Sequence, residues 1–273
     1  MDPLNQLTIA DIVAAIPSGT KLALPTHYAG VSMAATRELL RSSTRNLHLV
    51  CVPTAGMQAD LLIGAGLVQT VETSAVSLAE AGGAPCFNRA VCGGKVKIMD
   101  ATCPALIAGL TAAQKGAPFA AIRGIIGSDV LASRPDWRVI DNPFAQDDPV
   151  VLVPALRPDV ALFHAAKADR LGNVWIGRLR ELATMAYASH ATYVTVEEIV
   201  DEDLLGNEEL SAGVLPALYV SGVAVAPRGA WPYPLQGCYR GDPKEVFAYA
   251  EAAKTPEGFA AYVEQSNENK VTA

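Results

Sequence analysis

This sequence has few cysteines and no cluster of basic residues. The five cysteines are odd in number and include no CxxC pair, so neither a disulfide framework nor a zinc site is indicated. Cys51 and Cys103 lie in mostly apolar stretches, where we expect buried, reduced thiols. The net charge of −7 is spread along the chain, which disfavours binding to nucleic acid or to an anionic membrane, because both reward clustered Lys and Arg.

Long apolar runs are missing as well. No stretch approaches the ~20 residues that a membrane-spanning helix needs. The N-terminal string MDPLNQLTIADIV has acidic residues where a signal peptide has a basic region. We therefore expect a cytoplasmic protein with no membrane segment. The four histidines lack the spacing of metal ligands and no GxSxG motif is present, so we expect neither a metal site nor a hydrolase of that type.

Strand and helix patterns alternate along the chain. Hydrophobic residues make up 51% of the 273 residues, which is enough for a sizeable core. The alternation predicts parallel strands joined by crossover helices. Strands are predicted at 20–24, 47–52, 68–71, 96–99, 119–122, 150–153, 160–163, 191–196 and 219–225, and helices at 32–40, 104–115, 181–189 and twice within 243–262. No repeat or linker interrupts this pattern, so residues 1–273 are expected to form a single domain.

The first strand-to-helix junction carries polar residues instead of a nucleotide-binding motif. It reads LPTHYAGVSM rather than GxGxxG, which argues against a dinucleotide site. Pro25, Thr26, His27, Tyr28 and Gly30 follow the first strand, where a doubly wound sheet places its ligands. Polar side chains and free backbone amides there could bind an oxyanion. The structural alternative is that Pro25 and Gly30 only shape a turn and that His27 is a hydrogen-bonded loop residue.

Two later junctions also have reactive or charged side chains. Asp100, Thr102 and Cys103 lie between a strand and a helix in MDATCP. Cys103 has no visible base or other feature to activate its thiol, so packing is favoured over catalysis. Arg123 ends an apolar run in PFAAIRGIIGSD, where its guanidinium could meet a carboxylate or a phosphate. A surface ion pair is the alternative interpretation.

Further polar residues occur in the second half of the chain. Asp169, Gly172 and Asn173 are typical of a tight turn after a strand, because Asn and Gly tolerate left-handed geometry. The acidic run in TVEEIVDEDLL could supply paired carboxylates for acid–base chemistry, but a solvated edge or loop is the favoured interpretation.

Several strings, taken in order, resemble the α subunits of class I coenzyme A transferases of the glutaconate type. They are PFAAIRGIIGSDVL, VPALRPDVALFHAAKADRLGNVWIG, TVEEIV, PRGAWP and EAAKTPEGFAAYV, and the resemblance extends over nearly the whole chain from about Thr20. It implies an α/β fold with an open, doubly wound, mostly parallel sheet and flanking helices. It also implies a heterodimer, often doubled, with a separate β subunit.

The resemblance implies a division of labour between the two subunits. A β-subunit glutamate attacks the donor thioester and forms covalent intermediates, so no nucleophile is expected in this chain. Acyl-coenzyme A and a carboxylic acid are the implied substrates, with coenzyme A itself a substrate and no cofactor required. Together with the junction residues described above, the resemblance suggests these substrate-binding candidates: Thr26, His27, Tyr28, Gly30, Thr102 and Arg123.

Two departures from the family pattern affect the choice of reaction. The family's glycine-rich turn of GGF type is replaced by Pro25, Thr26 and His27, which puts the usual short-chain specificity in question. The chain also resembles steroid-ring hydrolases of the same family, in which a glutamate follows MD. Ala101 stands at that position, which favours transfer over hydrolysis, although Arg123 matches an active-site arginine of that branch. A ligand-sensing domain is a third alternative, disfavoured because the DNA-binding segment of such proteins is missing.

Overall fold

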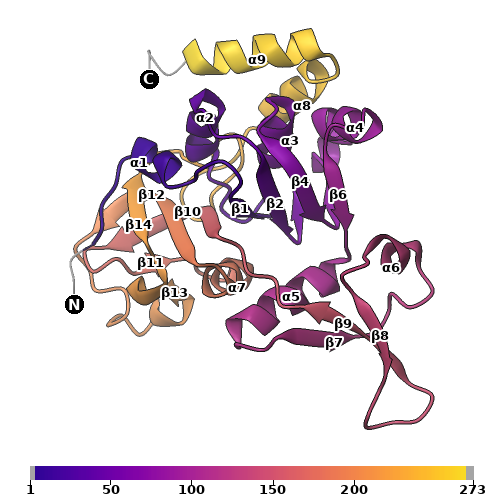
Figure 1. Ribbon diagram of the computed structural model, residues 1–273. Coiled ribbons are helices and arrows are strands. Elements are labelled where there is room, and N and C mark those ends of the chain that lie inside the picture. The colour runs from indigo at the N-terminus through magenta and orange to yellow at the C-terminus, as the bar shows by residue number, and fades with distance from the viewer. Residues whose placement is uncertain (1–3, 269–273) are drawn as a thin grey trace.

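The first half of the chain builds four parallel strands that end at a common edge of one sheet. The computed structural model describes residues 4–268. β1 (Lys21–Pro25), β2 (Leu47–Val52), β4 (Val68–Thr73) and β6 (Lys97–Asp100) lie side by side in that order, all parallel. Crossovers containing α2 (Met33–Arg41), α3 (Met57–Gly64) and α4 (Pro85–Cys92) connect them (Figure 1). The predicted strands and the first predicted helix are confirmed here.

The second half extends the same sheet on the other side of β1. β10 (Val160–Asp169) pairs with β1, β12 (Ala191–Val200) pairs with β10, and β14 (Gly222–Val225) pairs with β12, all in parallel. Successive strands are therefore added on one side of β1 up to β6 and on the opposite side from β10 onward, so the strand order reverses between β1 and β10. Such a switch point is where open α/β sheets bind ligands, outside the carboxyl ends of the strands. Beyond its pairing with β1, β10 pairs antiparallel with β11 (Val174–Trp175), which in turn pairs with β13 (Val214–Leu215).

Helices cover both faces of the sheet, because its strands point apolar side chains toward each face in turn. Leu22 and Leu24 of β1 point to one face, where they pack in a core with residues of α2, α3, α8 (Pro243–Ala252) and α1 (Ile9–Ala14). Ala23 points to the other face, into a second core formed with α5 (Cys103–Gln114) and α7 (Arg180–Ala188). A parallel sheet buried on both faces is the arrangement expected for the predicted doubly wound fold, which is thereby confirmed.

The remaining helices and short strands complete the described chain. The chain after α8 breaks at Thr255 and resumes as α9 (Pro256–Glu268), as the predicted pair of C-terminal helices required. β3 (Thr54–Ala55) and β5 (Ala75–Val76) form a two-stranded sheet, and the 3-10 turns are η1 (Ala79–Ala81), η2 (Ser211–Gly213) and η3 (Ala217–Tyr219). Among residues 4–268 no helix is long and apolar enough to cross a membrane.

Two predicted strands lie outside the parallel sheet, which corrects the expected alternation of strands and crossover helices. β7 (Phe119–Ile122) and β9 (Pro149–Pro154) form a three-stranded antiparallel sheet with β8 (Arg138–Asp141), in the order β7-β9-β8. Residues 119–154, which include the short α6 (Asp129–Ser133), are called the insert below. A hairpin joins β8 to β9, and a hairpin can only produce antiparallel neighbours. Figure 1 shows the insert projecting from the sheet beyond β6.

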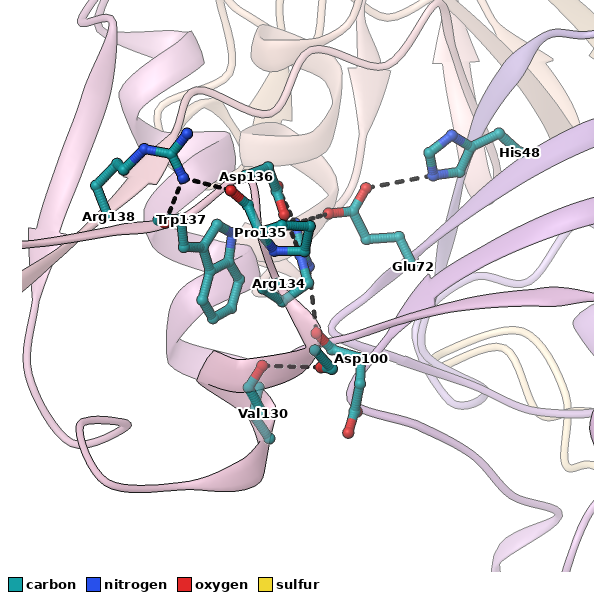
Figure 2. A network of polar contacts seen from close by, with 10 residues as sticks. His48, Glu72, Asp100, Val130, Arg134, Pro135, Asp136, Trp137 and Arg138 are labelled. Atoms are coloured by element: carbon teal, nitrogen blue, oxygen red, sulfur yellow. Dashed lines mark hydrogen bonds and ion pairs between the residues drawn. The ribbon is translucent and has the colours of Figure 1, made fainter.

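A buried arginine attaches the insert to the sheet (Figure 2). Arg134, which follows α6, donates from Nη2 to Glu72 Oε1 of β4 at 2.8 Å and from Nη1 to the Asp100 carbonyl at the end of β6 at 3.3 Å. It also forms two bonds with Asp136, and its guanidinium lies 4.3 Å from the centroid of the Trp137 ring. The insert is therefore fixed to the carboxyl end of two adjacent strands.

Glu72 is the buried anion of this network. Its side chain is 5% exposed, and Oε2 lies 3.3 Å from His48 Nε2. Burial alone would raise the pKa of Glu72, but the neighbouring His48 ring and Arg134 guanidinium hold it below its ordinary value. Glu72 is therefore ionised at neutral pH and serves as the counter-charge for Arg134.

Candidate functional site

The carboxyl ends of β1, β2, β4 and β6 form a continuous row of small polar side chains. Thr26 Oγ1 and Thr54 Oγ1 lie 2.8 Å apart. Ser74 Oγ donates to the Pro53 carbonyl at 2.8 Å and lies 3.1 Å from Cys103 Sγ. We call Thr26, Thr54, Ser74 and Cys103 the strand-end row. Because all four strands are parallel, residues distant in sequence meet at this edge, beside the switch point.

The loop after β1 leaves two backbone amides available at this edge. The Ala29 amide donates to the Thr26 carbonyl at 2.9 Å and closes a turn around His27 and Tyr28. Within residues 4–268, the N–H groups of His27 and Tyr28 donate to no acceptor. Two adjacent free amides beside polar side chains form a potential oxyanion site.

Gly30 is required by a close approach between this loop and β10. Its φ is +72°, and a Cβ added there would lie 2.1 Å from the His164 carbonyl oxygen. The Gly30 carbonyl accepts the His164 amide at 2.6 Å. Gly30 therefore holds the loop against β10, and the structure shows a shaping role for this predicted site residue.

His27 and Tyr28 belong to an aromatic cluster with Tyr233. The ring centroids of His27 and Tyr28 are 4.3 Å apart, and those of Tyr28 and Tyr233 are 6.0 Å apart. Burial lowers the pKa of His27, partly offset by the Glu80 carboxylate, so the imidazole is neutral at pH 7. The Tyr28 hydroxyl donates to Glu80 at 2.6 Å, and burial together with this bond raises the pKa of Tyr28 to about 12.

The other predicted site residues are at two different places. Thr102 is the N-cap of α5, and its Oγ1 accepts the Ala105 amide at 3.4 Å, next to the strand-end row. Arg123 follows β7 in the insert, where it makes a bidentate salt bridge with Asp148 and is 63% exposed. The structure thus shows Arg123 in the surface ion pair that we predicted as the alternative to substrate binding. A role in binding a substrate carboxylate stays a prediction and requires the salt bridge to open.

Of the two cysteines that we expected to be buried, one is buried and the other is exposed. Cys51 is fully buried in β2, and burial raises the pKa of its thiol to about 12. Cys103 is exposed, so the expectation that it is buried is wrong. It begins α5 at the open edge of the sheet, where an apolar neighbourhood in sequence does not produce burial. In residues 4–268 no group of three or more His, Cys, Asp or Glu side chains could hold a metal ion.

A buried polar pair next to the loop was not identified from the sequence. His164 of β10 is fully buried; its Nε2 lies 2.7 Å from Glu197 Oε1 and its Nδ1 lies 2.8 Å from Thr195 Oγ1, which in turn bonds Ser32. Burial alone would raise the pKa of Glu197, but its bonds to His164 and to the Arg228 amide hold it below its ordinary value.

This arrangement corrects the interpretation of the acidic run as a solvated edge at Glu197 alone. Glu197 is 16% exposed and paired, whereas Glu198, Asp201, Glu202 and Asp203 are exposed as expected. The available signal was a histidine inside the apolar string ALFHAA, because a polar residue in a buried strand needs a partner. The predicted turn after β10 is confirmed: Asp169 Oδ1 accepts the amides of Leu171 and Asn173, both at 2.9 Å.

Tyr28 separates two cavities. One, of about 270 Å³, is lined mostly by apolar residues together with His164 and Arg178, and is called the Arg178 pocket. The other, of about 340 Å³, is called the aromatic pocket and is lined by Tyr28, Leu78, Glu80, Tyr233, Val246, Phe247 and neighbouring Ala, Gly and Pro residues. Both adjoin the loop after β1, and Tyr28 lines each of them.

Known proteins share both the sequence pattern and this fold. The model of the family described as coenzyme A transferase matches residues 6–226. A 3-oxoadipate CoA-transferase subunit of Pseudomonas knackmussii is 34% identical over 239 residues, which cover 86% of this chain and 83% of that protein. The cholesterol ring-cleaving hydrolase IpdA subunit of Rhodococcus jostii is 32% identical over 241 residues, covering 85% and 80%. Glutaconate coenzyme A-transferase from Acidaminococcus fermentans superposes with a TM-score of 0.88 at 27% identity, covering 98% of this chain and 93% of that chain.

Proposed function

Because this chain belongs to the coenzyme A transferase family, we propose that it is the α subunit of a heteromeric coenzyme A transferase whose active site lies at the strand-end row. The substrates are an acyl-coenzyme A and a carboxylic acid, the partner is a separate β subunit, and no bound cofactor takes part. The complex works in the cytoplasm. The family membership supports the reaction, and the polar edge at the switch point supports the location.

The reaction proceeds through covalent intermediates on the partner. A β-subunit glutamate attacks the thioester carbonyl, and the coenzyme A thiolate leaves to give a mixed anhydride. The thiolate then attacks the glutamyl carbonyl, which releases the first carboxylate and forms a glutamyl thioester. The acceptor carboxylate reverses both steps and leaves as the new acyl-coenzyme A. The strand-end row fits this division of labour, because it offers hydroxyls and a thiol but no carboxylate.

The loop after β1 stabilises the charge that develops on the reacting carbonyl. Each attack places negative charge on an oxygen, and N–H groups fixed in advance stabilise that charge without reorganising. Among residues 4–268, the amides of His27 and Tyr28 are two donors at this edge with no acceptor in the chain. The row of polar side chains at the switch point, with these amides beside it, is the observation that carries the assignment of the site. Because the pKa of His27 is lowered, the ring beside these amides is neutral and adds no charge to the site.

A hydrolase of the same fold is the second candidate, because one relative is named as a ring-cleaving hydrolase. At the position where that branch has a carboxylate, this chain has Ala101, which is 4% exposed. A buried methyl group cannot activate water, which favours transfer.

The test is to express the chain together with the β-type subunit, and to assay exchange of coenzyme A between a thioester and an isotopically labelled carboxylate. We expect ping-pong kinetics, and inactivation by borohydride only after incubation with the acyl donor, with the modified glutamate on the β subunit. The proposal is wrong if water consumes the thioester at the full rate and no carboxylate accelerates the reaction. Normal turnover by the isolated chain would also contradict it.

A further inference from the structure

The aromatic pocket adjoins the loop after β1, to which Thr26 of the strand-end row belongs. Tyr233 contributes to its wall, and the Tyr233 hydroxyl accepts the Met57 amide at 3.0 Å, just after β3. Thr54 of β3 bonds Thr26 in the row. A Cβ at Gly56 would lie 2.7 Å from both the His27 Cβ and the Tyr233 hydroxyl, so this glycine lets the pocket wall and the loop approach each other. Tyr28 lines the pocket and lies two residues after Thr26, so the loop after β1 contributes to both the row and the pocket.

The pocket offers apolar contact and is closed on one side by buried residues. Leu78, Tyr233 and Val246 are 2%, 3% and 8% exposed, while Phe247 stands at the rim and is 50% exposed. Burial raises the pKa of Tyr233, so its hydroxyl remains neutral. A volume of about 340 Å³ lies in the range of small-molecule sites, which are mostly apolar and preformed.

The charges around the pocket exclude an anionic ligand tail. Its lining contains no Lys or Arg, and the charged member is Glu80, whose carboxylate accepts the Tyr28 hydroxyl. A second carboxylate entering this space would lose its hydration without gaining a cation and would face Glu80. The Arg178 pocket, which Tyr28 also lines, differs because it contains a cation.

We propose that the aromatic pocket binds the acyl tail of the substrate, and that this tail is apolar and uncharged, as in a monocarboxylic acid of medium chain length. The inference rests on the proposed function and makes it more specific. It sets this chain apart from relatives whose names specify dicarboxylic substrates, 3-oxoadipate and glutaconate. Phe247 and Glu80 are the residues that determine this specificity.

The test compares two acceptors of equal length in the assembled complex, with acetyl-coenzyme A as the donor. We expect kcat/KM to be at least about tenfold higher for hexanoate than for adipate, the discrimination that one or two apolar contacts can supply. Phe247→Arg places a cation at the pocket rim and should reduce this ratio by about tenfold or more. Ala248→Arg is the matched control, because Ala248 is exposed on the same helix but does not line the pocket, and the ratio should not change.

The outcomes separate this inference from the proposed function. Exchange that is intact but faster with adipate in the wild-type complex overturns the pocket assignment and leaves the transferase standing. The pocket assignment is also overturned if Phe247→Arg lowers the yield of the complex and lowers kcat/KM equally for hexanoate and adipate, since Phe247 would then be a subunit contact. If no carboxylate exchanges at all, both proposals fail. The wild-type comparison needs no variant and therefore decides the matter even if Phe247→Arg does not fold.

Discussion

Replacing Arg134 with Ala should detach the insert from the sheet and destabilise the protein strongly. The guanidinium is 4% exposed and is the cation between Glu72, itself 5% exposed, and Asp136. Removing one partner of a buried ion pair costs about 3–5 kcal/mol, and Glu72 stays buried with the His48 ring, 3.3 Å away, as its remaining partner. Asp136 is 40% exposed and can be hydrated, so most of the loss comes from Glu72. For a chain of this size each kcal/mol lowers Tm by about 2–4 °C, which gives a fall of about 6–20 °C.

The measurement is thermal unfolding of the coexpressed complex, with two comparison variants. Arg138→Ala is the matched control, because within residues 4–268 this exposed arginine bonds only the backbone carbonyls of Pro135 and Trp137, and Tm should stay near that of the wild type. The double variant Glu72→Leu/Arg134→Met removes both buried charges and should recover most of the loss. The reasoning is refuted if Arg134→Ala behaves like Arg138→Ala, or if the double variant is as unstable as Arg134→Ala.

Three further predictions concern the loop after β1 and its neighbours. Gly30→Ala should lower both Tm and activity, because its Cβ would lie 2.1 Å from the His164 carbonyl oxygen; wild-type behaviour in both assays would contradict the close approach. The pKa of Glu197 is lower in the folded protein than its unfolded value of 4.5, so the stability that Glu197 contributes is present above pH 4.5 and is lost as pH falls through the folded pKa. In Glu197→Gln, Tm should therefore depend less on pH in that acidic range. A Tm profile identical to that of the wild type would refute this. His27→Ala should lower kcat/KM by the equivalent of about 1–3 kcal/mol of transition-state stabilisation and leave Tm unchanged, whereas Cys103→Ser should change kcat/KM little. The reverse result would indicate a thiol mechanism.

Local patterns in the sequence predicted most strands of the parallel sheet, several helices and the edge at which the polar residues meet, but not α1, α3 or α4. Period-two and period-3.6 runs of apolar residues predicted β1 through α2 and the two C-terminal helices, because side-chain periodicity follows directly from backbone geometry. The polar residues at the carboxyl ends of parallel strands had to share an edge, so Thr26 and the residues after β6 could be placed near each other before the structure was known. The resemblance to coenzyme A transferases depended on ordered strings and is confirmed by the family match.

Only the tertiary structure decided which side chains are partners. His164 and Glu197 meet because β10 and β12 are parallel neighbours in a register that pairs His164 with Thr195, and no local pattern specifies register between distant strands. The antiparallel sheet of the insert, the exposure of Cys103 and the approach of Tyr233 to Tyr28 are likewise products of packing between segments far apart in sequence. The sequence by itself thus determined the parallel α/β framework and the edge at which chemistry occurs, whereas strand register and packing determined the pocket and its charges, because those depend on contacts that form only when the whole chain is folded.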